Sequence, residues 1–515
     1  LFLSARSEAA LRAMAGRYAA CLDTMPAGHF YDVAYAAATG RERLEKRLAL
    51  VAGSSEDAVR DLAGYAEGDS PAGIFIEDAL PDSGGVAFVY SGNGAQWLGM
   101  ARTLMAESPR FAGILTDIDG QVRKLAGFSI LKELLADEAS SRLHDTVVAQ
   151  PLLFAIQVGI TMLLEDHGVK PSGVAGHSVG EVAAAWAAGA LTLEQAVRVI
   201  VFRSAAQGAT HGLGKMAAAS ISQDAAQEAI SGFGEDLDVT VAAVNSPHMV
   251  TFAGSEDDMA VLGEHFKSRN VHFKLLDLDY AFHSRHMDSV RDSLIRNLGD
   301  FVPSPCTKAV FASAVSGEAL DGSSLDAGYW WCNVRETVNF EAAVAALAKS
   351  GCRVFVEIGP HAILQRYMRD TLAALAVKGR VLPTLRKNAD GLERIVEVAL
   401  RVHLLADSPA KEVFFPHAGR EVRLPSYPWQ HESFWHPVSS ESLGAIDRRR
   451  VHPLLGWPLP GQDSAWENVL DPVVLPWLGD HKVGGAVVFP GTGYAEMGLA
   501  AARQWRGDGL LALEE

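Results

Sequence analysis

The chain has 515 residues, of which 49% are hydrophobic and 21% charged, and its formal net charge is −17. This composition suits about three or four packed globular domains and excludes a mainly disordered chain, and the negative charge argues against a nucleic-acid-binding surface. Four scattered cysteines without a CxxC spacing disfavour a disulfide framework and a zinc site. The N-terminal LFLSARS is not a signal peptide, and charged residues interrupt every long apolar run. We therefore expect a soluble, cytoplasmic protein with no metal and no membrane segment.

The first 84 residues predict a small α/β unit. Residues 7–25 have the apolar periodicity of a helix that begins after a serine cap, and LALVA (48–52) is typical of a strand. An acidic stretch with glycine and proline at 67–85 separates this unit from the rest of the chain.

From residue 86 onward, strands and helices alternate regularly. VAFVYS (86–91), SGVAG (172–176), CRVFVEIG (352–359) and RVLPTL (380–385) are typical of buried strands. Residues 147–168 between the first two strands predict a long amphipathic helix. Strand–turn–helix units of this kind predict a parallel sheet that helices cover on both faces.

Two segments depart from this alternation. Four strand-like segments and two helical segments within 216–280 follow a βαββαβ order, which predicts an inserted ferredoxin-like subdomain. After a helix at 392–405, an extended RLPSYPWQHESFW segment leads to a linker, SSESLGAIDRRR (439–450). The last 65 residues are predicted to be rich in strands.

Gly176-His177-Ser178-Val179-Gly180 matches the GxSxG pattern of a nucleophile elbow. Glycines on both sides let the backbone close a sharp strand-to-helix turn and expose the serine oxygen. The alternative is a structural serine in a tight turn. The strand before it and the small-residue helix after it favour the nucleophile.

A serine nucleophile needs a base, and His283 in DYAFHSRHMD is the candidate. A metal-ligand pair with His286 or a capping histidine are the alternatives. No acidic residue or cysteine of metal-ligand spacing lies nearby in the sequence, so we favour the base.

Arg203 is a guanidinium inside an otherwise apolar helical segment, VRVIVFRSAAQG. A buried guanidinium needs an anionic partner. That partner is either a structural Asp or Glu, or a substrate carboxylate that the arginine holds bidentately.

The loop Ser91-Gly92-Asn93-Gly94-Ala95-Gln96 resembles a dinucleotide-binding loop but does not match GxGxxG, because Trp97 replaces the third glycine. A loop that offers backbone N–H groups to a developing oxyanion is the better interpretation.

Seven motifs, GNGAQW, AQPLLFAIQ, GHSVGE, FRS, AAVNSP, YAFHS and VEIGPH, occur in one order. Together they resemble the malonyl-type acyltransferase domain of type I polyketide synthases and the related fatty acid synthases. The resemblance implies a ketosynthase–acyltransferase linker domain (1–84) and an acyltransferase (85–385) with an α/β-hydrolase-like parallel-sheet core and a ferredoxin-like subdomain (about 213–281). It also implies a post-acyltransferase linker (386–450) and an N-terminal fragment of a dehydratase with the hot-dog fold (451–515).

The resemblance implies a role for each matching residue. Ser178 would be the acylated nucleophile and His283 its general base, with the backbone carbonyl of Asn333 orienting the histidine. The backbone N–H groups of Val179 and Asn93 would form the oxyanion hole, although Asn93 replaces the glutamine that is usual there.

The substrate pocket is implied in the same way. Gln150 would line it and Arg203 would hold the free carboxylate of the extender unit. The family usually has HAFH for malonyl and YASH for methylmalonyl selectivity, and this chain has a hybrid that includes Tyr280 and Phe282. Phe282 fills the space of a 2-methyl group, so we expect malonyl, with methylmalonyl as the alternative.

The reaction that follows is a ping-pong transfer from malonyl-CoA to the phosphopantetheine thiol of an acyl carrier protein, with no permanently bound cofactor. The expected partners are that carrier protein and an upstream ketosynthase in the same polypeptide. His481, in the dehydratase motif HxxxGxxxxP, is expected to be inactive in this fragment, because the family's acidic partner belongs to a second half beyond Glu515.

Two other classes remain as alternatives. A serine hydrolase or thioesterase shares GxSxG, but it predicts an acid between serine and histidine and an HGGG-like loop, and it does not explain Arg203. A degenerate acyltransferase with only a docking role is disfavoured because Ser178, His283 and Arg203 are all present.

Overall fold

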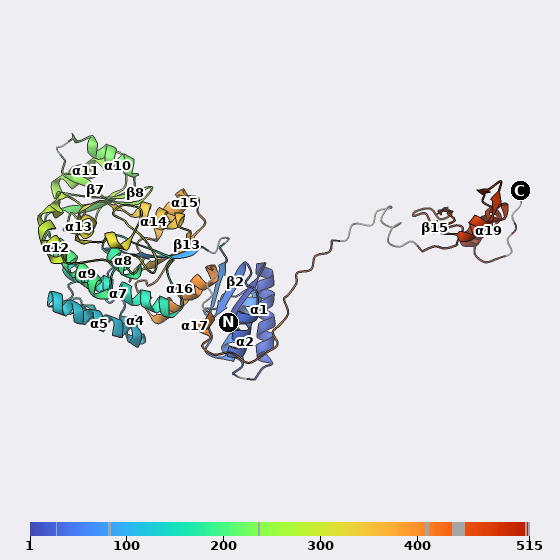
Figure 1. The fold of residues 1–515 in the computed structure, drawn as a ribbon, viewed down its shortest axis with the longest axis horizontal. Helices are drawn as coiled ribbons and strands as arrows, with labels where there is room; N and C mark the ends of the chain where they lie inside the picture. The colour runs from blue at the N-terminus through green and yellow to red at the C-terminus, as the bar shows by residue number, and fades with distance from the viewer. Residues whose placement is uncertain are drawn as a thin grey trace. The chain divides into compact units, whose positions relative to one another are not determined.

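The computed structural model describes residues 1–26, 28–80, 84–234, 237–406, 411–434, 449–509 and 512. The chain divides into two compact units, Leu1–Trp429 and Gln430–Glu515 (Figure 1). The predicted boundaries at residues 84 and 385 lie inside the first unit and stay predictions. Most of the predicted linker 439–450 lies outside the described residues.

The N-terminal part of the first unit is a small α/β structure, as the sequence predicts. Its strands β1 (Phe2–Ala5), β2 (Lys46–Leu50) and β3 (Ile74–Asp78) form an antiparallel sheet. Helices α1 (Glu8–Asp23), α2 (Phe30–Gly40) and α3 (Ser55–Glu67) share a buried apolar cluster with it. The predicted serine cap is present, since the Ser7 side chain accepts a hydrogen bond from the Ala10 N–H.

A six-stranded sheet forms the centre of the first unit, in the order β11-β10-β5-β4-β13-β14. Its strands are β4 (Gly85–Tyr90), β5 (Gly173–Gly176), β10 (Val310–Ala312), β11 (Ala319–Leu320), β13 (Cys352–Ile358) and β14 (Arg380–Pro383). Only β11 is antiparallel to its neighbour. Successive residues of β4 belong to different cores, Phe88 and Tyr90 to one and Ala87 and Val89 to the other. The predicted parallel sheet with two covered faces is therefore confirmed.

Most helices of this part of the first unit lie along the chain between these strands, and the last two follow β14. They are α4 (Arg102–Glu107), α5 (Pro109–Ala126), α6 (Ile130–Leu135), α7 (Thr146–Asp166), α8 (Gly180–Ala187), α9 (Leu193–Gly208), α12 (Arg291–Leu298), α13 (Ala327–Arg335), α14 (Phe340–Lys349), α15 (Gln365–Ala374), α16 (Leu392–Leu405) and α17 (Lys411–Phe414). Residues of α7, α8 and α9 belong to one of the two cores, and residues of α14 and α15 to the other (Figure 1).

Helix α7 differs from its prediction as an amphipathic helix. Nearly all of its side chains are buried, because it packs against α5, α8 and α9 as well as the sheet. By length and composition it could cross a membrane, and 89% of its apolar window is buried inside the domain, as in the core helix of a globular protein.

The inserted subdomain has the predicted βαββαβ order. It consists of β6 (Lys215–Ala219), α10 (Gln223–Ser231), β7 (Val239–Ser246), β8 (Met249–Gly254), α11 (Glu256–Ser268) and β9 (Phe273–Leu275). The sheet order β7-β8-β6-β9 is ferredoxin-like, and β12 (Val338–Asn339) extends it beside β7. The chain returns to the core directly before Tyr280.

After α17, the chain runs back over the N-terminal α/β structure without regular secondary structure. The Tyr427 hydroxyl accepts a hydrogen bond from the Arg6 N–H at 3.1 Å, and Asp32 accepts one from the Arg420 N–H at 2.8 Å. Apolar side chains of this segment also pack against the N-terminal cluster: Phe415, Val422, Leu424 and Tyr427.

The second unit differs from its prediction as strand-rich. Its described residues hold four two-residue strands, β15 (Trp457–Pro458), β16 (Trp466–Glu467), β17 (Lys482–Val483) and β18 (Ala486–Val487), a 3-10 helix η4 (Pro476–Asp480), and a 16-residue helix, α19 (Gly491–Arg506). His481 is exposed here, and its Nδ1 lies 2.6 Å from the Val488 carbonyl oxygen.

Candidate functional site

Ser178 lies on a sharp turn between β5 and α8, as the GxSxG pattern predicts. Its φ of 52° is in the left-handed region, which non-glycine residues seldom adopt. A Cβ on Gly176 would lie 2.1 Å from the Glu181 nitrogen, and a Cβ on Gly180 would lie 2.3 Å from the Tyr90 carbonyl oxygen. Both flanking glycines are therefore required by close backbone contacts, and the turn directs the serine oxygen toward His283.

The predicted base, His283, follows the inserted subdomain in the chain and lies beside the serine. Nε2 of His283 lies 2.8 Å from Ser178 Oγ, and its Nδ1 lies 2.9 Å from the Glu336 carbonyl oxygen. Burial lowers the pKa of His283 to about 3, with help from the nearby Arg203 and His177. The imidazole is therefore neutral at neutral pH, and the carbonyl selects the tautomer with the proton on Nδ1.

The prediction that the Asn333 carbonyl orients this histidine is wrong. Asn333 lies inside α13, and the carbonyl oxygen that faces the histidine belongs instead to Glu336, the C-cap residue of that helix. The Asn333 side chain has a different place in the site: its Oδ1 accepts a hydrogen bond from Arg203 Nε at 2.7 Å.

Arg203 is fully buried on α9 beside the serine. Its Nη2 donates to Ser178 Oγ at 2.9 Å, and its Nη1 donates to the side-chain oxygens of Gln150 and Gln207, both at 2.8 Å. Burial lowers the pKa of Arg203 to about 9, so the guanidinium is charged at neutral pH. All of these hydrogen-bond partners are uncharged, so the structural ion pair considered as an alternative is not among the contacts of the described residues.

A buried carboxyl group, that of Glu181, is connected to the Arg203 guanidinium through the side chain of Asn333. Glu181 Oε2 accepts hydrogen bonds from Asn333 Nδ2 at 2.7 Å and from the Tyr329 hydroxyl at 3.0 Å. Burial raises the pKa of Glu181 to about 7, although these hydrogen bonds and one from the Ala314 N–H oppose the shift. Asn333 thus connects Glu181 to Arg203 and fixes the plane of the guanidinium.

The two expected oxyanion donors lie on adjoining turns. Val179 is the N-cap of α8, and its N–H follows the serine directly. The Asn93 loop lies close to the elbow, because a Cβ on Gly92 would lie 2.7 Å from the His177 carbonyl oxygen. Gln96 braces the loop by accepting a hydrogen bond from the Gly94 N–H at 2.8 Å.

Tyr280 and Phe282 precede the base and are both buried. Their rings stack with centroids 4.6 Å apart and an interplanar angle of 18°. Tyr280 also contacts the ring of His211 edge-on at 5.2 Å. The hybrid YAFH segment is therefore a stacked aromatic pair next to His283.

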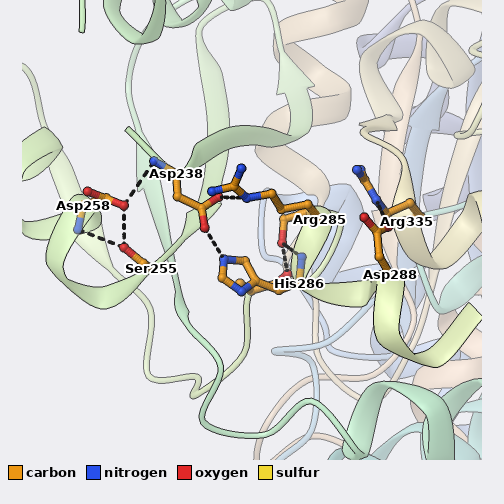
Figure 2. A network of polar contacts seen from close by, with 9 residues as sticks. Asp238, Ser255, Asp258, Arg285, His286, Asp288 and Arg335 are labelled. Carbon is orange, nitrogen blue, oxygen red and sulfur yellow. Dashed lines mark hydrogen bonds and ion pairs between the residues drawn. The ribbon is translucent and has the colours of Figure 1, made fainter. Parts of the chain in front are cut away.

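The segment after His283 is tied to its surroundings by ion pairs (Figure 2). Asp238, from the inserted subdomain, lies 2.6 Å from Arg285 Nε and 3.0 Å from His286 Nε2. Asp288 lies 2.6 Å from Nε of Arg335, which directly precedes Glu336. His286 thus faces a carboxylate. No group of three or more metal-ligating side chains is present among the described residues, so the metal-pair alternative gains no support.

Several residues of this site were not predicted from the sequence. Glu336 and Gln207 lie outside the seven motifs, and Glu181 is the last residue of GHSVGE but had no role assigned to it. The available signals were spacing on helices, since Gln207 follows Arg203 by one turn and Glu181 follows Ser178 by three residues. The predicted residues Ser178 and His283, by contrast, meet directly.

Comparison with known families assigns three parts of the chain. Residues 87–408 match the family described as "Acyl transferase domain", residues 1–62 the family "CurL-like, PKS C-terminal", and residues 452–515 the family "Polyketide synthase dehydratase domain".

Full-length relatives are much longer than this chain. "Polyketide synthase GfsB" of Streptomyces halstedii is 35% identical over 484 residues, which are 92% of this chain and 8% of the relative. "Erythronolide synthase EryA2" of Saccharopolyspora erythraea is 33% identical over 524 residues, 100% of this chain and 14% of the relative. The chain therefore spans a small part of the relatives it matches.

Solved structures agree with the fold. The acyltransferase domain from module 8 of the salinomycin polyketide synthase has a TM-score of 0.72 and 31% identity, covering 78% of this chain and 95% of that domain. The acyltransferase domain of SpnD, solved as a complex with 2-(pent-4-yn-1-yl)malonyl, has a TM-score of 0.68 and 28% identity, covering 81% and 97%.

Proposed function

Because the chain belongs to the acyltransferases of type I polyketide synthases, we propose that it moves a malonyl group from malonyl-CoA to an acyl carrier protein through an ester on Ser178. One observation carries the proposal: His283 Nε2 and Arg203 Nη2 both contact Ser178 Oγ, at 2.8 and 2.9 Å. A base and a carboxylate-binding cation on one nucleophile suit a carboxylated acyl group.

In the first half-reaction, Ser178 Oγ attacks the thioester carbonyl while His283 Nε2 takes its proton. The N–H groups of Val179 and Asn93 stabilise the oxyanion. The C–S bond then breaks, the CoA sulfur takes the proton from His283, and malonyl remains as an ester on Ser178.

In the second half-reaction, the phosphopantetheine thiol of the carrier protein gives its proton to His283 and its sulfur attacks the ester carbonyl. The C–O bond breaks, Ser178 Oγ regains the proton, and the malonyl thioester leaves on the carrier protein. The neutral imidazole is the form needed at the start of both halves, which agrees with its lowered pKa.

The free carboxylate of malonyl is assigned to Arg203. Among the described residues its partners are neutral amides and a hydroxyl, so a substrate carboxylate would supply the first direct anionic contact. An acyl group without that carboxylate would leave the charge unpaired, which is the basis of the selectivity.

Malonyl is preferred over methylmalonyl because Phe282 is stacked and buried beside the base. One methyl group is worth only about 1–3 kcal/mol in an apolar pocket, so methylmalonyl is the second candidate substrate.

A serine hydrolase is the second candidate class. His283 Nδ1 faces the Glu336 carbonyl, where such enzymes place a carboxylate, and this disfavours it. We further propose a cytoplasmic protein without a permanently bound cofactor, acting with an acyl carrier protein and with a ketosynthase of the same polypeptide.

The proposal is tested by intact-protein mass spectrometry with malonyl-CoA and methylmalonyl-CoA in competition. We expect rapid malonylation of the wild type, none of Ser178→Ala, and transfer when carrier protein is added. Arg203→Ala should shift the preference from malonyl-CoA toward acetyl-CoA. Rapid release of free malonate without carrier protein would identify a hydrolase, and an unmodified wild-type mass would show that the site is inactive.

A further inference from the structure

Gln207 lies one turn after Arg203 on α9, inside the polar cluster around Ser178. Its side chain is 1% exposed, and its Oε1 accepts hydrogen bonds from Arg203 Nη1 at 2.8 Å and from Gln150 Nε2 at 2.7 Å. Its Nε2 is buried and has no hydrogen-bond partner among the described residues. A buried amide donor without an acceptor is unfavourable, so this atom points to an acceptor that is present only when the site is occupied.

The donors of Arg203 are nearly all used by neighbouring side chains. The guanidinium has five N–H groups. One bonds Asn333, two bond the oxygens of Gln150 and Gln207, and one bonds Ser178 Oγ. Only one N–H remains, whereas a bidentate carboxylate needs two. One of the neutral oxygens must therefore leave when a carboxylate binds.

The three carboxamides around Arg203 differ in how firmly they are held. Asn333 Nδ2 donates to the Ser178 carbonyl and to Glu181, at 3.2 and 2.7 Å. Gln150 Nε2 donates to Thr146 Oγ1 at 3.0 Å, in addition to Gln207. The Nε2 of Gln207 has no such contact among the described residues, so its carboxamide is the one that can rotate at least cost.

We infer that Gln207 is a specificity-determining residue for the free carboxylate of the acyl group. The carboxylate replaces Gln207 Oε1 at Arg203 Nη1 and accepts a hydrogen bond from Gln207 Nε2. In the structure the Gln207 amide oxygen occupies the place of the carboxylate on the guanidinium. With the acyl group bound, the Gln207 amide nitrogen donates to the carboxylate. This inference rests on the proposed function.

Acyl groups without a carboxylate would gain nothing from this exchange. With acetyl-CoA, the Gln207 oxygen stays on Arg203 and the Nε2 stays without an acceptor. Gln207 therefore contributes to malonyl transfer and not to acetyl transfer, which separates it from residues that serve the chemical step for every substrate.

Gln207→Met tests this, because methionine has a similar volume and no amide. We expect kcat/KM for malonyl-CoA to fall by about tenfold, mainly through KM, since one hydrogen bond to a charged group is lost. Acetyl-CoA should be unaffected. Gln207→Glu, which keeps the shape but adds a negative charge beside Arg203, should lose more malonyl activity. Gln227→Met, on exposed α10, is the control and should behave as the wild type.

The outcomes separate the two proposals. An equal loss with both substrates, or no loss in either Gln207 variant, would reject the role of Gln207 while the malonyl transfer of the wild type stands. A wild type that malonyl-CoA does not acylate would reject the proposed function and this inference with it. Melting temperatures of the variants show whether a loss of activity comes from a loss of fold.

Discussion

At the scale of single residues, the site depends on a histidine that stays uncharged. Burial lowers the pKa of His283 to about 3, well below the usual value of 6.5. In the proposed reaction the neutral form is the base, so activity from this group should be present above pH 3 and lost only as the pH falls toward that value.

We therefore expect protonation of His283 to cause no loss in the single-turnover rate of Ser178 acylation between about pH 5 and 8. The unfolded chain binds a proton on this histidine below about pH 6.5 while the native chain does not, so His283 should also weaken the fold progressively on the acidic side. Acylation rates measured at each pH by mass spectrometry of quenched reactions test the expected pH dependence. A rate that halves near pH 6.5 would contradict it.

Phe282 sets a second prediction at this scale. Its ring stacks on Tyr280 and fills the space next to the base. Replacing it by serine should open that space and raise kcat/KM for methylmalonyl-CoA relative to malonyl-CoA by about ten- to a hundredfold, the range expected for one methyl group. Competition between the two CoA esters measures the ratio. An unchanged ratio would remove the steric argument for malonyl.

At the scale of elements, the strand–helix elbow with Ser178 and the segment with His283 come from distant parts of the chain. The fold must therefore hold them in a fixed position relative to each other. The contacts of Figure 2 link the base segment to the inserted subdomain through Asp238 and to the end of α13 through Asp288. Since α13 ends at the residue before Glu336, these ion pairs act on both sides of the imidazole.

Asp238→Asn should therefore lower kcat for malonyl transfer by about two- to tenfold with little change in KM, because the base is displaced and the carboxylate site is not. Steady-state kinetics at low and high salt measure the effect. Glu264→Gln, which breaks an exposed ion pair with Lys267 in the same subdomain, is the matched control. A loss confined to KM would contradict a positioning role.

The elements were largely predictable from the sequence, and the reasons are local. The GxSxG elbow, the alternating strands and the helices and strands of the βαββαβ insertion are each indicated by residues that lie close together in the sequence. The carbonyl of Glu336 could not be assigned because any backbone carbonyl near a helix end can accept a hydrogen bond, and its identity depends on where α13 stops. Gln207 was missed because a buried glutamine has no signature until its neighbours are known.

Two helices, α7 and α19, differ from their predictions. Helix α7 contains polar residues that suggested an exposed face, but its Gln150 and Gln157 make buried hydrogen bonds instead. In the second unit, the small residues of GTGYAEMGLAAARQW give a weak periodic signal for the helix α19. Tertiary contacts account for the burial of α7.

At the scale of the whole molecule, all residues of the proposed acyltransferase site lie in the first unit, Leu1–Trp429. A chain ending at Trp429 should therefore be malonylated at the rate of the full chain. A chain ending at Phe414 loses the segment whose apolar side chains pack on the N-terminal cluster, and its Tm should fall by several degrees. Calorimetry and acylation rates of the two truncations check this. Equal Tm values would show that the segment adds no stability.

The backbone conformation of Ser178 and His283 is energetically unfavourable, and interactions elsewhere in the fold must offset it. Both Ser178, with φ 52°, and His283, with φ 60°, hold a left-handed conformation that costs a non-glycine residue roughly 1–2 kcal/mol. Glycine would relieve this backbone cost at either position, but at His283 it would also remove a buried ring and its two hydrogen bonds. Stabilising changes elsewhere in the core are therefore the ones that can offset the cost and leave the proposed chemistry intact.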